Sequence, residues 1–147
     1  MKDESQLASA RENGLARLHH IGIVVASIDE SGESIARSLG ATWDQNIISD
    51  PLQKVRVTFL KGSHNSDSLI ELVEPGGEDS PVTQFLQRGG GLHHLCYEVS
   101  NLDEHLEFCR TVGNIIIRKP VPAVAFGGRR IAWVVTRKRL LVEFLEQ

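Results

Sequence analysis

The sequence predicts an α+β fold in which two βαβββ modules form one open, U-shaped, eight-stranded, barrel-like sheet with the helices outside. The main observation is an internal repeat, because Leu18–Ile21 (Leu-His-His-Ile) recurs 74 residues later as Leu92–Leu95 (Leu-His-His-Leu). The second observation is that Ile70–Glu74 recurs 72 residues later as Val142–Glu146. Hydrophobic patterning does not demand the repeated polar residues, so the sequence favours a duplication over two similar strand–helix units.

The predicted strands follow the same order in both copies. The opening runs, His20–Val25 and His94–Val99, are rich in the residues typical of strands. Two longer apolar runs close each copy, and a fainter one precedes them. These further strands are expected at Thr42–Trp43, Lys54–Leu60 and Ser68–Val73 in the first copy, and at Ile115–Ile117, Arg130–Val135 and Leu140–Leu145 in the second.

One capped helix is predicted after the opening strand of each copy. Ser27 with Glu30 matches a capping box, in which side chains satisfy the first free backbone N–H groups of a helix. Asn101 begins a variant of the same motif in the second copy. Gly40 and Gly113 stand at the expected helix ends, where a residue at positive φ is favoured.

The two copies are expected to form one domain, because each module is too small to bury a good core alone. In the segment between them, Ser80 and Pro81 predict the start of a short helix, and Gly89–Gly91 ends it. The expected boundaries are residues 1–16 for a flexible N-terminal tail, 17–75 for the first module, 76–91 for the linker and 92–147 for the second module.

Composition and charge exclude several classes of function. The 147 residues carry a net charge of −3, without the basic excess of a nucleic-acid-binding protein. The apolar run Ile21–Ala26 is far too short to cross a bilayer, and the N-terminus shows no apolar leader. The two cysteines, Cys96 and Cys109, lie in different predicted elements, which favours a reducing compartment. We therefore expect a cytoplasmic protein with no nucleic-acid and no membrane partner.

An acid stands among aliphatic residues near the end of each copy. Glu71 and Glu143 each share a strand face with apolar neighbours. A carboxylate on such a face is costly to bury unless it is paired or bound to a cation. If a pseudo-two-fold axis relates the copies, His20 and His94 converge with both acids. Two imidazoles and two carboxylates suit a divalent ion such as Co²⁺, Ni²⁺, Zn²⁺ or Mn²⁺.

The remaining histidines and repeated acids stand in less specific contexts. We expect His19 and His93 to point away from the centre, towards packing or towards hydrogen bonds behind the ligands. Glu74 and Glu146 are expected to face solvent or to support the ligands, and His64 and His105 to lie on the surface.

Paired βαβββ modules with histidine on the first strand and glutamate on the last resemble the vicinal oxygen chelate superfamily. The resemblance covers residues 17–146, and within the superfamily the chain is similar to the methylmalonyl-CoA epimerases. That similarity implies that His20, Glu71, His94 and Glu143 occupy the metal-ligand positions. The stretches that carry it are Leu18–Ile23, Glu71–Pro75 with Asp79–Pro81 and Phe85–Leu86, and Gly91–His94.

The resemblance implies proton removal beside a metal-chelated carbonyl of an acyl-CoA thioester substrate. Glu143 is the first candidate base, and Glu71 is its counterpart for the opposite face of the substrate. Glu98 is a weaker candidate. A further catalytic acid of similar epimerases aligns near the strand Lys54–Leu60, which contains no acid here.

Two basic clusters and the oligomeric state complete the expectations. The clusters are candidates for binding the phosphates of a CoA-like carrier, with a solvated strand edge as the alternative. Similar proteins form dimers, so the resemblance implies a homodimer. The basic residues are Arg129, Arg130, Lys138 and Arg139.

Three other functions stay open. A lactoylglutathione lyase like glyoxalase I uses the same ligand set, but its first helix carries an aromatic pair that Ser34–Leu39 lacks. A non-catalytic member of the superfamily would bind a small molecule without metal. An epimerase or isomerase of another acyl thioester is the third, because Thr136–Arg139 replaces the His-Pro-Lys turn of similar epimerases.

Overall fold

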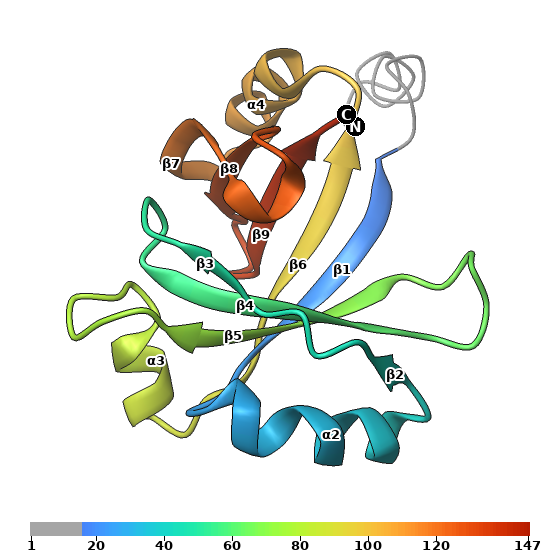
Figure 1. Cartoon of the computed structure of the whole chain (residues 1–147). Helices are drawn as coiled ribbons and strands as arrows, with labels where there is room; N and C mark the ends of the chain where they lie inside the picture. The colour runs from blue at the N-terminus through green and yellow to red at the C-terminus, as the bar shows by residue number, and fades with distance from the viewer. Residues whose placement is uncertain (1–15) are drawn as a thin grey trace.

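The structure is a computed structural model that describes residues 16–147, so the predicted tail lies outside the described residues except for its last one. One nine-stranded sheet has the order β2-β4-β5-β1-β6-β9-β8-β7, with β3 paired to β4 (Figure 1). The strands are β1 (Arg17–Val24), β2 (Thr42–Trp43), β3 (Ile48–Asp50), β4 (Val55–Lys61), β5 (Leu69–Pro75), β6 (Gly91–Val99), β7 (Ile115–Pro122), β8 (Arg130–Val135) and β9 (Leu141–Glu146), and the helices are α2 (Ile28–Leu39), α3 (Thr83–Gln87), α4 (Leu102–Thr111) and the 3₁₀ turn η1 (Val124–Phe126).

Two βαβββ modules on one open sheet confirm the predicted α+β fold. β1 and β6 run side by side through the middle of the molecule, and α2 and α4 lie at its opposite ends (Figure 1). Eight strands lie along the continuous path as expected, and the short strand β3 is additional. Within the described residues, no helix combines the length and the apolar character needed to cross a bilayer.

The strand register contains a pseudo-two-fold axis between β1 and β6. In this antiparallel pair, His20 lies opposite Cys96 and Gly22 lies opposite His94. Exchanging the two modules converts one pair into the other. The outer neighbours obey the same exchange, because β5 places Glu71 beside Gly22 and β9 places Glu143 beside Cys96 in parallel pairing. The duplication therefore brings equivalent residues together at the centre of the sheet.

The two long helices begin with the predicted caps. Ser27 Oγ accepts a hydrogen bond from the backbone N–H of Glu30 at 3.3 Å, and Asn101 Oδ1 accepts one from Glu104 at 3.2 Å. The glycines expected at the helix ends adopt positive φ, which is 65° for Gly40 and 80° for Gly113. The caps at both ends of the two helices were therefore predicted correctly from the sequence.

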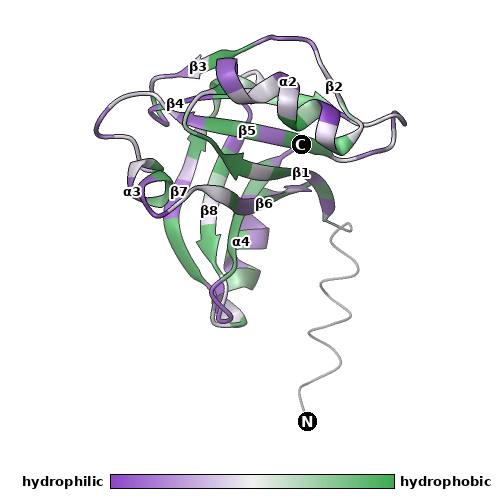
Figure 2. Cartoon of the chain, turned by 90° about the horizontal axis from the view of Figure 1, so that it is seen from below, coloured by the Kyte–Doolittle hydropathy of each residue, from purple (hydrophilic) through white to green (hydrophobic). Residues whose placement is uncertain are grey.

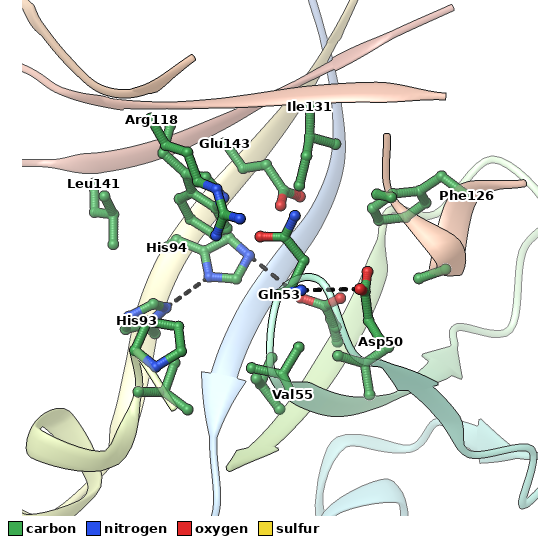
Figure 3. A pocket seen from close by; sticks show the side chains of 18 of the residues that line it. Asp50, Gln53, Val55, His93, His94, Arg118, Phe126, Ile131, Leu141 and Glu143 are labelled. Atoms are coloured by element: carbon green, nitrogen blue, oxygen red, sulfur yellow. Dashed lines mark hydrogen bonds and ion pairs between the residues drawn. The ribbon is translucent and has the colours of Figure 1, made fainter. Parts of the chain in front are cut away.

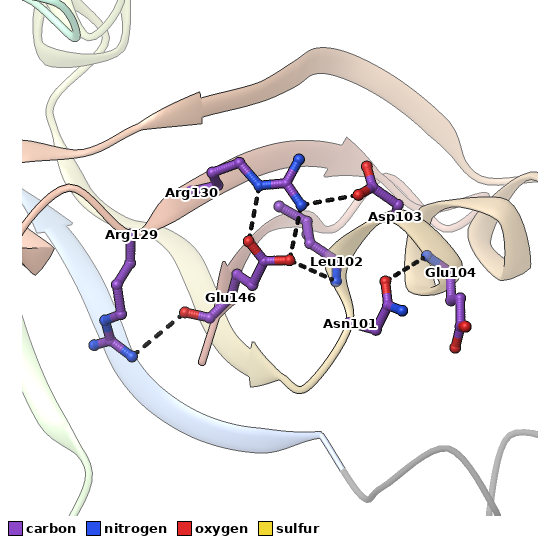
Figure 4. A network of polar contacts seen from close by, with 7 residues as sticks. All are labelled: Asn101, Leu102, Asp103, Glu104, Arg129, Arg130 and Glu146. Carbon is purple, nitrogen blue, oxygen red and sulfur yellow. Dashed lines mark hydrogen bonds and ion pairs between the residues drawn. The ribbon is translucent and has the colours of Figure 1, made fainter.

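A second, buried cap comes from the last strand of each module. Glu74 Oε2 accepts a hydrogen bond from the backbone N–H of Ile28 at 2.6 Å, and its other oxygen pairs with Arg56. Glu146 repeats this arrangement more loosely, with Leu102 N at 3.4 Å and Arg130 at 2.8 Å (Figure 4). A carboxylate at a helix N-terminus is favoured by the helix dipole. These acids therefore support the helices rather than the histidines.

Each helix covers the same face of its module. Residues facing α2 alternate along the strands with residues facing the opposite side, so Leu72 packs under the helix while Glu71 points away from it. Figure 2 shows apolar segments, in green, on the strands of the sheet. The helix-facing core includes Ile28, Ala36, Leu60 and Leu72 in the first module, and Leu102, Leu106, Val134, Val142 and Phe144 in the second.

Two local expectations are wrong. The linker helix α3 begins at Thr83 rather than at Ser80, because Ser80–Val82 form a turn in which Thr83 N donates to Ser80 O at 3.2 Å. His105 does not lie free on the surface. It is half-buried, and its ring lies 4.3 Å from that of Phe144, centroid to centroid, which adds it to the packing under α4.

Candidate metal centre and active site

Four neighbouring strands each contribute one predicted ligand to the face of the sheet opposite the helices. In the order β5-β1-β6-β9 these residues are Glu71, His20, His94 and Glu143. All four are buried, with relative exposures of 0% for His20, 4% for Glu143 and 5% for the other two. Buried titratable groups at one spot point to a functional site rather than to ordinary packing.

Three of the donor atoms form a nearly equilateral triangle. His20 Nε2 lies 3.2 Å from His94 Nε2 and 3.2 Å from Glu71 Oε2. The third side, from His94 Nε2 to Glu71 Oε2, is 3.3 Å. Ligand bonds of about 2.0–2.2 Å give edges of about 3.0 Å around an octahedral ion and about 3.4 Å around a tetrahedral one. The triangle therefore matches the spacing of atoms bound to a single cation.

The fourth predicted ligand lies beside this triangle. Glu143 Oε1 is 3.4 Å from His20 Nε2. Among the described residues, that oxygen is buried and has no hydrogen-bond partner. A buried carboxylate oxygen without a donor is costly unless a cation or a ligand meets it. Glu143 therefore has a free acceptor that is aimed into the centre.

The first histidine of each repeated pair orients the second. His19 Nδ1 lies 2.9 Å from His20 Nδ1, and His93 Nδ1 lies 2.8 Å from His94 Nδ1. A hydrogen bond at Nδ1 fixes the ring and leaves Nε2 directed at the centre, as metal-binding histidines require. The expected hydrogen bonds behind His20 and His94 are present, but His93 does not point away from the centre, because it also lines the adjoining cavity.

Gly22 leaves the room that His94 occupies. A Cβ atom at position 22 would lie 2.0 Å from Cε1 of the His94 ring and 2.4 Å from its Nδ1. Any side chain here would displace an imidazole that three contacts hold in place. The glycine of the Leu18–Ile23 motif is thus explained by ring packing rather than by backbone conformation.

The charges at the centre are strongly coupled. Burial would lower the pKa of His20, but the carboxylates of Glu71 and Glu143 raise it. Burial would raise the pKa of Glu71, but the facing imidazoles hold it well below its usual range. For Glu143, burial and the charge of Glu71 raise the pKa. Two acids side by side thus demand positive charge between them, which a divalent cation supplies more fully than one proton.

The donor set fits a borderline divalent cation. It offers two imidazole nitrogens and two carboxylates, and the free oxygen of Glu143 provides the position that the triangle lacks. Both imidazoles already have their outer nitrogens bonded, so neither must reorient. The cluster formed by His20, Glu71 and His94 is therefore suited to hold a metal, with Glu143 adjacent.

A cavity of about 310 Å³ opens on this centre from between the modules (Figure 3). This volume lies at the lower end of the range of small-molecule sites. It would hold an acyl group rather than a whole nucleotide-bearing carrier. Most of its walls are apolar and come from both modules and the linker, including Val55, Val57, Val73, Pro81, Val82, Ile117, Ile131 and Leu141.

Five polar or aromatic residues of this pocket were not predicted. Asp50 and Gln53 come from the end of β3 and the turn after it, Arg118 from β7, Phe126 from η1, and Trp133 from β8. The Trp133 ring lies 4.7 Å from that of His94, centroid to centroid. None of them belongs to a repeated motif, so the sequence carried no signal that would have selected them.

The predicted basic residues do not gather at one place. Arg129 and Arg130 lie at the start of β8, whereas Lys138 and Arg139 lie in the exposed turn after its end. Arg130 is bonded to Glu146 and Asp103 (Figure 4). The four residues therefore cannot grip one phosphate group together.

The weaker base candidate is also engaged away from the pocket. Glu98 pairs with Arg129 at 3.0 Å and with Arg17 at 3.7 Å. Burial would raise the pKa of Glu98, but these guanidinium groups lower it. It is not among the residues that line the cavity.

A family model described as the Glyoxalase/Bleomycin resistance protein/Dioxygenase superfamily matches residues 19–133. The chain therefore belongs to this superfamily, as the resemblance predicted. The match spans both copies of the repeat and three of the four predicted ligands.

The similar proteins narrow the relationship to one branch. The mitochondrial methylmalonyl-CoA epimerase of Dictyostelium discoideum is 28% identical over 141 residues, which cover 91% of this chain and 80% of the relative. The mouse enzyme of the same name is 34% identical over 90 residues, which cover 60% of this chain and 48% of that protein. A variant of Streptomyces coelicolor methylmalonyl-CoA epimerase, in complex with 2-nitronate-propionyl-CoA, is similar with a TM-score of 0.75 at 28% identity, covering 91% and 99% of the two chains.

Proposed function

We propose that the chain is a metal-dependent epimerase that moves the proton beside the carbonyl of an acyl-CoA thioester, with methylmalonyl-CoA as the first substrate to test. The observation that carries this proposal is the meeting of two histidines and two glutamates from four neighbouring strands at the floor of a small apolar pocket. The names of the similar proteins support the same reaction.

His20, Glu71, His94 and Glu143 would hold the cation. When bound, it acts as a Lewis acid on the substrate carbonyl, which makes the neighbouring proton more acidic. The protein supplies the remaining requirements. His19 and His93 fix the ring orientations, and the apolar walls shield the reacting carbon from bulk water.

Glu143 is the proposed base. Its Oε1 has no donor among the described residues, whereas Glu71 Oε2 is in contact with both imidazoles. A ligand that no protein donor holds can loosen from the cation and accept a proton more easily than a carboxylate held by two imidazoles. Glu71 faces the centre from the pseudo-symmetric position and is the proposed partner for the opposite face of the planar intermediate.

Deuterium exchange tests this function. Protein loaded in turn with Co²⁺, Ni²⁺, Zn²⁺ or Mn²⁺ is incubated with methylmalonyl-CoA in D₂O, and deuterium at the α-carbon is followed by mass spectrometry. We expect exchange with at least one metal and its loss after chelation. Glu143→Gln should abolish exchange of one of the two epimers in the loaded protein, because Glu71 still serves the opposite face. Absence of exchange with every metal refutes the proposal.

The same experiment distinguishes the proposed epimerase from the lactoylglutathione lyase alternative. The hemithioacetal of glutathione and methylglyoxal is supplied to the same loaded samples. Turnover of this compound without exchange on methylmalonyl-CoA would transfer the function to the lyase. No observation in the described structure favours it.

The cellular setting and assembly stay predictions of this proposal. A cytoplasmic location is checked by cell fractionation. The expected homodimer is checked by light scattering of the full chain after gel filtration. A measured mass equal to that of the monomer, 16.3 kDa, would contradict it.

A further inference from the structure

We propose that Gln53 and Arg118 form a subsite that binds a carboxylate of the substrate beside the metal centre. This inference rests on the proposed function and deepens it, because it names the chemical group that the pocket recognises. Methylmalonyl-CoA carries such a carboxyl group next to the reacting carbon, and these two residues would recognise it.

Arg118 places a cation on an apolar wall without a counter-charge. Its side chain lines the cavity beside Ile117 and Val55. Its Nη2 donates a hydrogen bond to the backbone oxygen of Leu52 at 3.3 Å. Within residues 16–147, no carboxylate pairs with it, although Arg56, Arg129 and Arg130 all have acidic partners. Arg118 is half-exposed, so its guanidinium is open to an anion that enters the pocket.

Gln53 adds a buried donor that has no acceptor. The residue is 8% exposed, and its Nε2 has no hydrogen-bond partner among the described residues. Native structures leave few buried amide groups unbonded, so this N–H is available to a molecule that enters the pocket. Because the group is an N–H donor, the atom that it binds is an acceptor such as an oxygen.

Asp50 holds the turn that carries this donor. Its Oδ1 accepts hydrogen bonds from the backbone N–H groups of Leu52 and Gln53, both at 3.0 Å. Its Oδ2 accepts from Val124 N at 3.2 Å, which ties the turn to the second module. The position of Gln53 is therefore fixed before substrate binds, as preorganised recognition requires.

The two donors stand side by side although they come from different modules. Arg118 bonds the carbonyl of Leu52, the residue before Gln53. Figure 3 shows the guanidinium and the amide projecting into the same space as His94 and Glu143. A planar guanidinium with an adjacent amide matches the two oxygens of a carboxylate.

Besides the predicted metal ligands, the pocket lining carries one acid, Asp50, and one cation, Arg118. Asp50 uses both oxygens on backbone N–H groups, Oδ1 on Leu52 and Gln53 and Oδ2 on Val124. Arg118 is therefore the charged group that is left for an anionic part of the substrate, and a neutral hemithioacetal would make no use of it.

Binding of free methylmalonate to the zinc-loaded full chain tests the subsite without catalysis. Trp133 lines the pocket, so its fluorescence reports occupancy. Arg118→Met should weaken binding by about 10- to 100-fold and Gln53→Leu by about 5-fold. Lys119→Met, at the exposed next residue of the same strand, should change nothing and is the matched control. Unchanged affinity in Arg118→Met overturns the proposal.

Two further measurements separate the competing explanations. If Arg118→Met weakens binding of ADP but not of methylmalonate, the cation serves the carrier phosphates and the subsite is refuted. If the wild-type chain exchanges the α-proton but the KM of Arg118→Met stays unchanged, the subsite fails while the epimerase function holds. Methylmalonate binding that depends on Arg118, without exchange by the wild type, upholds the subsite and refutes the epimerase.

Discussion

Replacing His94 with alanine should abolish the stabilisation of the protein by metal, while replacing its neighbour His93 should not. His94 directs Nε2 at the centre, 3.3 Å from Glu71 Oε2 and 3.2 Å from His20 Nε2. His93 contacts only the outer nitrogen of that ring, at 2.8 Å, and packs on Phe85. The two adjacent substitutions therefore separate a ligand from its support.

The size of the effect follows from linkage. A metal at about 100 times its dissociation constant stabilises the folded protein by about 2.7 kcal/mol. A chain of 147 residues has an unfolding entropy of about 0.3 kcal/mol/K, at about 2.1 cal/mol/K per residue. The wild-type Tm should therefore rise by about 9 °C. His93→Ala should bind metal about 10- to 100-fold more weakly, yet show the same rise once more metal is added.

Thermal unfolding with increasing Co²⁺ or Ni²⁺ measures this shift, and metal content after gel filtration gives an independent reading. His64→Ala is the control, because His64 is exposed and lies outside the centre. Two results would mean that the wrong histidine was assigned to the metal. One is a full rise of Tm in His94→Ala, and the other is the absence of any rise in His93→Ala even at the highest metal concentration.

Other substitutions test the caps, the packing and the thiols. Glu74→Gln should lower the free energy of unfolding by about 2 kcal/mol, and the more exposed Glu146→Gln by less than about 1 kcal/mol, in urea titrations; equal losses would contradict the buried cap. Gly22→Ala should lose metal binding in calorimetry, whereas Gly32→Ala, whose new Cβ meets a tryptophan ring at 2.7 Å, should be less stable yet bind metal normally. Cys96, fully buried and with its pKa raised by burial, should react with Ellman's reagent only after denaturation; rapid labelling of the native protein would exclude this packing.

The features predicted correctly depend on short-range pattern combined with duplication. Strand alternation fixes the face of Glu71 and Glu143, and the repeat implies that their modules meet about an axis. The helix caps at Ser27 and Asn101 are equally local, because a side chain bonds a backbone group three residues later. These features can be predicted from the sequence because no distant contact is needed to produce them.

The features missed depend on contacts between modules. Gln53 and Arg118 are neighbours because a turn of the first module lies against β7 of the second, which no periodicity encodes. The turn at Ser80 imitated a helix start, because a serine before a proline is typical of both. The charge runs around Arg130 and Lys138 could be identified in the sequence, but their positions at opposite ends of β8 could not be predicted.

The two halves of the centre share the same strand register but make different contacts. The difference comes from positions 22 and 96, which are equivalent in the repeat. Position 22 is glycine and lies beside Glu71, so the His94 ring can close over that carboxylate. The equivalent position 96 is a buried cysteine beside Glu143, and the space that the glycine opens is filled there. One carboxylate is consequently held by two imidazoles, while the other keeps a free oxygen towards the pocket. A strictly symmetric site would give both acids the same contacts, so this asymmetry supports the proposed assignment, in which Glu143 rather than Glu71 is the first base.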